Sequence, residues 1–158
     1  MTPKQLFERL QDNLQALVWE GTSNLVFGEN IYVVPEVPIQ QLPDLISPTA
    51  FIVDKRFVND TEHPGIGFQN FALTCFVENV SSRFGQASML DGNRVTNTSK
   101  GVGTLNLADE VYSYLFSVTA LTTKIHILEK SAPTPMGIKG NYPLVTFSLN
   151  LSAFVSIY

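Results

Sequence analysis

The stretch that decides the fold class is PLVTFSLNLSAFVSIY, residues Pro143–Tyr158. Every second residue from Val145 to Ile157 is apolar, and small polar residues stand between them, with Phe154 as the one exception. This period of two predicts a β-strand with one buried face. The polar face carries no charge. We therefore expect that helices or partner subunits cover this face, or that the strand lies at the centre of a sheet.

Two other segments have the spacing of amphipathic helices. The first begins after Thr2, a favourable N-cap, with Pro3 at the first helical position, and we expect Gly21 to end it. The second covers Leu105–Leu121, with Asn106 and Asp109 able to cap its start. The apolar residues that recur at helical spacing are Leu6, Leu10, Leu14 and Leu17 in the first, and Ala108, Val111, Tyr112, Leu115 and Val118 in the second.

The rest of the chain alternates between expected strands and polar connections. The expected strands are Val26–Val34, Thr49–Val53, Phe68–Val80 and Thr122–Lys130. The connections are a loop with four prolines after Val34, a polar turn region Asp54–Gly67, a long loop or extended hairpin Ser81–Gly103, and a turn-rich segment Pro133–Asn141. The predicted fold class is α+β: one domain, residues 1–158, in the order α-β-β-β-α-β-β. In it, two helices pack on one face of an antiparallel sheet.

The composition limits the classes of partner. Charged residues make up 15% of the chain and apolar residues 44%, so few charges are present to cover the surface and part of it is expected to contact other protein. The net charge is −4 and the ten basic residues are scattered, which argues against direct binding of duplex nucleic acid. No apolar stretch approaches the roughly 20 residues of a membrane span. Glu8, Arg9 and Asp12 interrupt any signal-peptide core. The sequence predicts a protein made in the cytoplasm, with no membrane partner.

Four features contain residue types that are used in catalysis or ligand binding, and each has a simpler structural interpretation. Asp60, Glu62 and His63 precede Pro64-Gly65 and read as a solvated turn. His126 lies between two isoleucines and is interpreted as a structural histidine. Cys75, the only cysteine, alternates with core residues and is expected to be a buried thiol. As a lone cysteine it excludes an internal disulfide and a thiolate zinc site.

The fourth feature is the segment Lys100-Gly-Val-Gly-Thr104, which precedes the second helix and is weakly similar to a phosphate-binding loop. Its lysine precedes the glycines, and Asn106 stands where a dinucleotide fingerprint has its third glycine. A hinge before a helix explains it better. We therefore expect no catalytic residue, no cofactor and no metal.

The loop Ser81–Gly103 is the one locally basic segment, because it holds three basic residues against the single acid Asp91. Loops of this length inside a compact domain are usually functional or disordered, and a solvated loop explains this segment equally well. Its candidate interface residues are Arg83, Asn93, Arg94 and Lys100.

The order of elements resembles that of the tail terminator family of long-tailed bacteriophages. The resemblance rests on the helix Leu6-Phe-Glu-Arg-Leu10, on Gly103-Thr-Leu-Asn-Leu-Ala-Asp-Glu-Val111 and on the closing strand Tyr142–Tyr158. It implies a structural virion protein of the tail or neck. Such proteins form a hexameric ring on the tail tube, end tube polymerisation and join the tail to head-completion (connector) proteins. The partners implied are copies of the chain itself, the tail tube protein and the connector, with DNA passing through the ring.

Two alternatives stay open at this stage. Another phage neck or minor tail protein would have the same pattern. In a different class, a small-ligand binding module or enzyme would use the Lys100–Thr104 loop or the turn at Asp60, Glu62 and His63, and would place converging polar groups in a pocket there.

Overall fold

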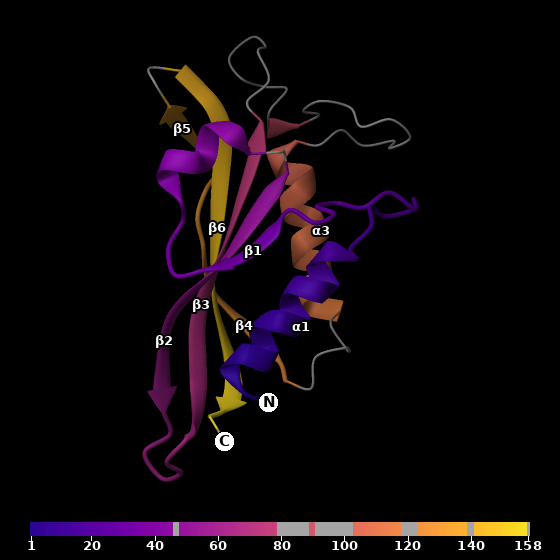
Figure 1. The fold of residues 1–158 in the computed structure, drawn as a ribbon. Coiled ribbons are helices and arrows are strands. Elements are labelled where there is room, and N and C mark those ends of the chain that lie inside the picture. The colour runs from indigo at the N-terminus through magenta and orange to yellow at the C-terminus, as the bar shows by residue number, and fades with distance from the viewer. Residues whose placement is uncertain (46–47, 79–88, 91–102, 118–122, 139–140, 158) are drawn as a thin grey trace.

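The computed structural model describes residues 1–45, 48–78, 89–90, 103–117, 123–138 and 141–157 (Figure 1). Its fold is α+β, with a mixed six-stranded sheet. The strands run in the order β1-β2-β3-β6-β4, and β5 pairs with β6 beside that path. The elements described are α1 (Pro3–Gln15), β1 (Ile31–Val34), the 3-10 helix η1 (Ile39–Asp44), β2 (Thr49–Asn59), β3 (Ile66–Glu78), α3 (Thr104–Ser117), β4 (Ile125–Lys130), β5 (Thr134–Ile138) and β6 (Asn141–Ser156).

The expectation of an entirely antiparallel sheet is wrong, because β1 pairs with β2 in parallel, from Ile31 beside Ala50 to Val34 beside Val53. Two parallel strands need a crossover connection instead of a tight turn. The proline-rich segment 35–48 supplies it, and η1 lies within this segment. The four prolines predict a loop with no helix and no central strand. Residues 35–45 form no strand, but the prediction of no helix is wrong, because Ile39–Asp44 forms η1 with Pro43 inside it. The prolines also did not reveal that the chain returns in the same direction.

The order of elements also differs from the expected one. Three strands follow α3 instead of two, and the additional strand is β5. β5 occupies the segment expected to be only turns, and Pro135 within it disfavours a strand in sequence reasoning. Proline is tolerated in a strand at the border of a sheet, because its missing N–H costs no ladder bond there. β5 pairs with β6 alone.

Several boundaries also moved. α1 ends at Gln15 with Ala16 as its C-cap, well before Gly21. The chain then turns back, so that the backbone N–H of Val26 donates to the carbonyl of Leu17. This return explains why Val26 and Phe27 are buried without belonging to β1. At the start of α1, Thr2 forms the expected cap, in a capping box with Gln5.

The helices α1 and α3 pack on one face of the sheet, which we call the helix face (Figure 1). The helix-face core joins leucines of α1 and apolar residues of α3 to alternate residues of β2, β3 and β6. Within it, the rings of Phe7 on α1 and Phe71 on β3 meet edge to face, with centroids 5.5 Å apart. The α+β expectation is confirmed at this level.

The register expected for the closing strand is confirmed. Phe147 and Leu149 are fully buried, whereas Ser148 is half-buried and Asn150 is exposed. β6 lies inside the sheet, with β3 on one side and β4 and β5 on the other. Its uncharged polar face therefore sits in a central strand, one of the expected explanations.

The opposite face of the sheet, the outer face, is covered over only part of its length. Leu42 of η1 is buried in a second, smaller apolar cluster. Its other buried members are Phe51, Val53, Ala72, Phe76 and Leu144. η1 thus covers the half of the outer face where β2 begins.

Candidate interaction surface

An apolar row crosses the uncovered half of the outer face. Val58, Phe68 and Phe154 are register partners on the adjacent strands β2, β3 and β6, and 40%, 44% and 47% of each residue is exposed. The two phenyl rings meet edge to face, with centroids 5.5 Å apart. We call these three residues the aromatic row. Neighbouring exposed apolar side chains of this size mark a contact surface more often than single ones do.

A polar row lies beside the aromatic row, one step nearer to η1. By register it runs from Arg56 through Asn70 and Ser152 to His126, so it crosses four strands. The aromatic row and this polar row together are called the bare half-sheet. An apolar centre bordered by polar side chains is the usual make-up of a protein–protein contact surface.

Two β-bulges flank the bare half-sheet at the same level. In β2, Lys55 is the extra residue between Asp54 and Arg56; in β4, Leu128 is the extra residue between Ile127 and Glu129. Both bulges oppose the Phe71–Leu151 pair of the two central strands. A bulge bends its strand and increases the local twist. A bulge in each of the two border strands therefore increases the twist of this part of the sheet.

A hollow of about 500 Å³ lies between the bulges. Its rim carries Lys55 and Arg56, here called the basic corner. Across the hollow, the side-chain amide of Asn150 donates to the Glu129 carboxylate at 3.0 Å, which holds that acid beside β6. The hollow is open to solvent, and the two charged side chains that line it from β2, Lys55 and Arg56, are both positive.

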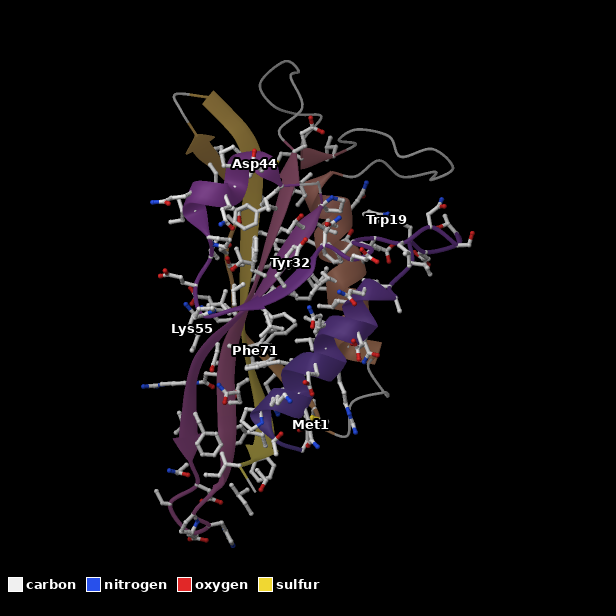
Figure 2. The ribbon with its side chains drawn as sticks, in the orientation of Figure 1. Met1, Trp19, Tyr32, Asp44, Lys55 and Phe71 are labelled. Carbon is white, nitrogen blue, oxygen red and sulfur yellow. The ribbon has the colours of Figure 1, made fainter. Side chains whose placement is uncertain are left out.

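The segment 35–45, which includes η1, forms a second exposed feature that we call the η1 arm. Its inner side is held down by Leu42. Ile39 points outward with 68% of its area exposed, and Glu36 and Asp44 are exposed as well. Figure 2 shows Asp44 and Lys55 on the same side of the sheet, away from α1. The η1 arm and the basic corner thus share the outer face at different points along it.

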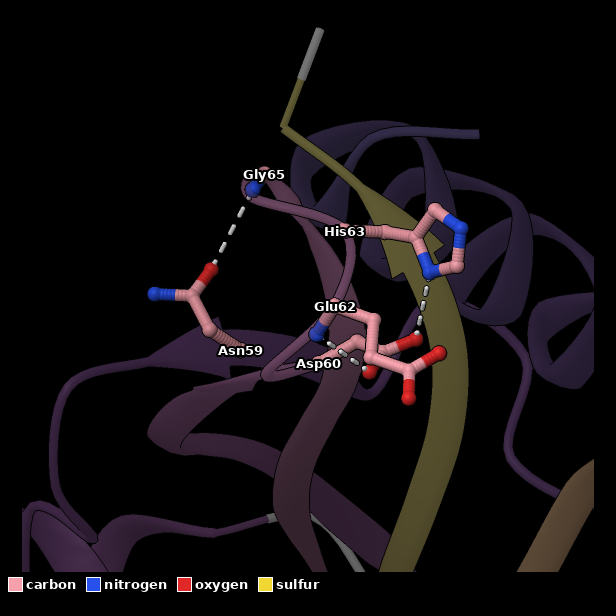
Figure 3. A network of polar contacts seen from close by, with 5 residues as sticks. All are labelled: Asn59, Asp60, Glu62, His63 and Gly65. Atoms are coloured by element: carbon pink, nitrogen blue, oxygen red, sulfur yellow. Dashed lines mark hydrogen bonds and ion pairs between the residues drawn. The ribbon is translucent and has the colours of Figure 1, made fainter.

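The turn that contains Asp60, Glu62 and His63, one of the candidate chemical sites, closes the hairpin between β2 and β3 (Figure 3). Asp60 accepts a hydrogen bond from the backbone N–H of Glu62 at 3.1 Å and lies 3.1 Å from Nδ1 of His63. The Gly65 N–H donates to the side-chain oxygen of Asn59 at 3.3 Å. Two hydrogen bonds lower the pKa of the Asp60 carboxyl. The larger effect comes from the backbone N–H of Glu62, and the next from the ring of His63. Glu62 and His63 are exposed, so the arrangement is the solvated turn that the sequence predicts.

The other chemical candidates are separate from one another. Cys75 is fully buried in the helix-face core, where burial raises the pKa of its thiol far above the ordinary value, as expected for a core thiol. His126 is exposed on β4, opposite Ser152, instead of packed as a structural histidine. Thr104 is buried at the start of α3, and the Gly103 carbonyl accepts from the N–H of Leu107.

The remaining sequence candidates are outside the described residues: Arg83, Asn93, Arg94 and Lys100. Among the residues that are described, no group of three or more His, Cys, Asp or Glu side chains is placed to hold a metal ion. Within the same ranges, no helix is both long and apolar enough to cross a membrane. No family model matches the sequence, and no curated protein matches it either.

Sequence reasoning missed the aromatic row, although one signal for it was visible. Phe154 is the single apolar residue on the polar side of the closing strand, and it is half-exposed there. An apolar residue that breaks a strict alternation on the solvent side is a reason to suspect a contact surface. Its partners Phe68 and Val58 could not be added from the sequence, because they come from two other strands.

Proposed function

We propose that this chain is a structural assembly protein of a bacteriophage tail. In this proposal it caps the tail tube as a hexameric ring, ends tube polymerisation and joins the tail to the head-completion proteins. It is made in the host cytoplasm, becomes part of the virion neck, and catalyses no reaction. The sequence pattern of the opening helix, of Gly103–Val111 and of the closing strand, which resembles that of tail terminators, suggests the class.

The observation that carries the proposal is the bare half-sheet. It places three apolar side chains, each between 40% and 47% exposed, in one row over three strands. Exposing such a row costs free energy in water, so a stable soluble domain keeps it where another protein covers it. A subunit of a closed ring needs surfaces of this kind, because each copy contacts a neighbour on both sides.

The charge distribution suits a ring with DNA passing through it. The net charge is −4, and the ten basic residues are scattered along the sequence. A weakly acidic inner surface would not hold DNA, since affinity for the phosphate backbone comes mostly from clustered lysine and arginine. In this proposal DNA passes through without sequence-specific binding.

The experiment is a nonsense mutation in this gene within the phage or prophage that encodes it. Electron microscopy of the lysate should then show tail tubes of uncontrolled length and heads without tails. The intact chain supplied from a plasmid should restore tails of uniform length joined to heads. Tails of normal length joined to heads in the mutant lysate would refute the proposal.

A second arm of the experiment concerns the basic segment between Arg83 and Lys100. Because its composition cannot supply a core, we propose that it acts as a contact arm toward the tube or the connector. Replacing it by a short Gly/Ser linker should leave the melting temperature nearly unchanged and abolish rescue in the plasmid assay. Full rescue by this variant would remove the segment from the interface and leave the ring proposal to the nonsense mutant.

A further inference from the structure

We infer that the η1 arm of one copy of this chain docks on the bare half-sheet of a second copy. In this contact, Glu36 and Asp44 of the arm meet Lys55 and Arg56 of the basic corner, and Ile39 meets the aromatic row. The contact specifies how neighbouring copies join in the proposed ring, and to that extent it rests on the proposed function.

Charge is strongly segregated along the chain. Between Arg9 and Lys55 the sequence contains six acids and no lysine or arginine. The remaining eight acids share the rest of the chain with all ten basic residues. The six acids are Asp12, Glu20, Glu29, Glu36, Asp44 and Asp54. Two of them lie on the η1 arm, so the arm is acidic with no cation of its own.

The basic corner is the opposite case. Lys55 is the extra residue of the β2 bulge, and Arg56 begins the polar row; both are exposed. Within the described residues, the ion pairs present join Lys4 to Glu8 and His63 to Asp60, so neither pair uses the basic corner. Two adjacent cations thus border the aromatic row and are available to an acidic partner surface.

The apolar parts of the two surfaces also match. Ile39 is the most exposed apolar residue of the η1 arm, at 68%, and it stands between Glu36 and Asp44 in sequence. The aromatic row likewise lies beside the basic corner on β2, where Val58 is two residues beyond Arg56. In the proposed contact, Ile39, which stands between two acids, thus meets an apolar row that lies beside two cations. Contacts of this type combine desolvated apolar groups with a charged border.

The contact must join two different copies. The arm already packs on its own sheet through Leu42, over the part of the outer face that contains Phe51 and Val53. Val58 is five residues beyond Val53 on the same strand, a separation of about 17 Å for an extended chain. Each copy therefore offers one arm and one bare half-sheet on the same outer face. Repeating this contact from copy to copy produces a ring if the rotation between neighbours closes, and an open filament if it does not.

A reciprocal charge swap tests the contact. One variant carries Lys55→Glu with Arg56→Glu, and the other carries Glu36→Lys with Asp44→Lys. All four side chains are exposed, so circular dichroism should show both variants folded. A matched control reverses two exposed cations of α1, which lies on the helix face away from both surfaces: Lys4→Glu with Arg9→Glu, which makes the same change in net charge as the first variant.

The assembly state is measured by native mass spectrometry and sedimentation at about 0.05 M salt, where charges 10 Å apart are only partly screened. The wild type and the control should assemble. Each swap variant alone should be monomeric, because its two surfaces then carry like charge. A mixture of the two variants should assemble with equal numbers of each, since every contact in it again joins opposite charges. An Ile39→Asp variant should weaken assembly at least about tenfold.

Two results would overturn the inference: a monomeric wild type, or folded swap variants whose mixture does not assemble. Both leave the tail function to the nonsense-mutant assay, which does not depend on which surfaces meet. Conversely, the two swap variants could assemble when mixed but form twofold dimers instead of rings. That result would establish this contact and count against the ring. The two proposals can therefore fail separately.

Discussion

Truncating Phe147 to alanine measures how much of the fold depends on the helix-face core. The side chain is 1% exposed and lies in the central strand β6, beside Cys75 of β3. Removing a fully buried phenyl group costs about 3–5 kcal/mol, from lost transfer free energy and the cavity left behind. Small domains have about 5–15 kcal/mol of stability in total, so this variant should retain only part of it. The melting temperature should fall by roughly 6–20 °C, at about 2–4 °C per kcal/mol for a chain of this size.

The matched control is Phe154→Ala on the same strand. Its ring is 47% exposed and loses mainly the edge-to-face contact with Phe68, which is worth about 0.5–1.5 kcal/mol. Urea denaturation followed by tryptophan fluorescence gives both free energies, because Trp19 is buried in the same core as Phe147. The slope with urea should be unchanged in the control. Equal losses in the two variants would show that the ring of Phe154 is as buried as that of Phe147, and would refute the assignment of faces.

Three further outcomes follow from local geometry. Gly67→Ala should cost more than about 2 kcal/mol in urea denaturation, since a methyl group there would overlap the backbone carbonyl of Val58, whereas Gly21→Ala should cost about 1 kcal/mol from its positive φ alone. Cys75 should react with a thiol reagent only as fast as the protein unfolds; rapid labelling of the native protein at pH 8 would contradict its burial. The lowered pKa of Asp60 means that its charged form stabilises the hairpin turn above the ordinary carboxyl pKa, and that this stabilisation is lost as the pH falls through the lowered value. Asp60→Asn should therefore flatten the acid limb of a plot of melting temperature against pH, and an unchanged limb would show that the turn contributes nothing.

The sequence by itself determined the features that depend on local repetition. Strict alternation placed Phe147 and Leu149 on the buried side of β6, and leucines at helical spacing placed α1 on the core. The cap at Thr2 and the buried position of Cys75 follow from the same kind of pattern. Such features are predictable because each side chain's direction is set by its own strand or helix, whatever that element packs against.

The tertiary structure alone decided everything that depends on which strands become neighbours. The parallel pairing of β1, the addition of β5, the opposed bulges and the aromatic row all join residues that are distant in the sequence. Phe154 meets Phe68 only because β6 pairs with β3, and Lys55 stands at a border only because β1 ends beside Val53. Periodicity shows which face of a strand is apolar but carries no information about its partner, because strand pairing is chosen by the packing of the whole domain.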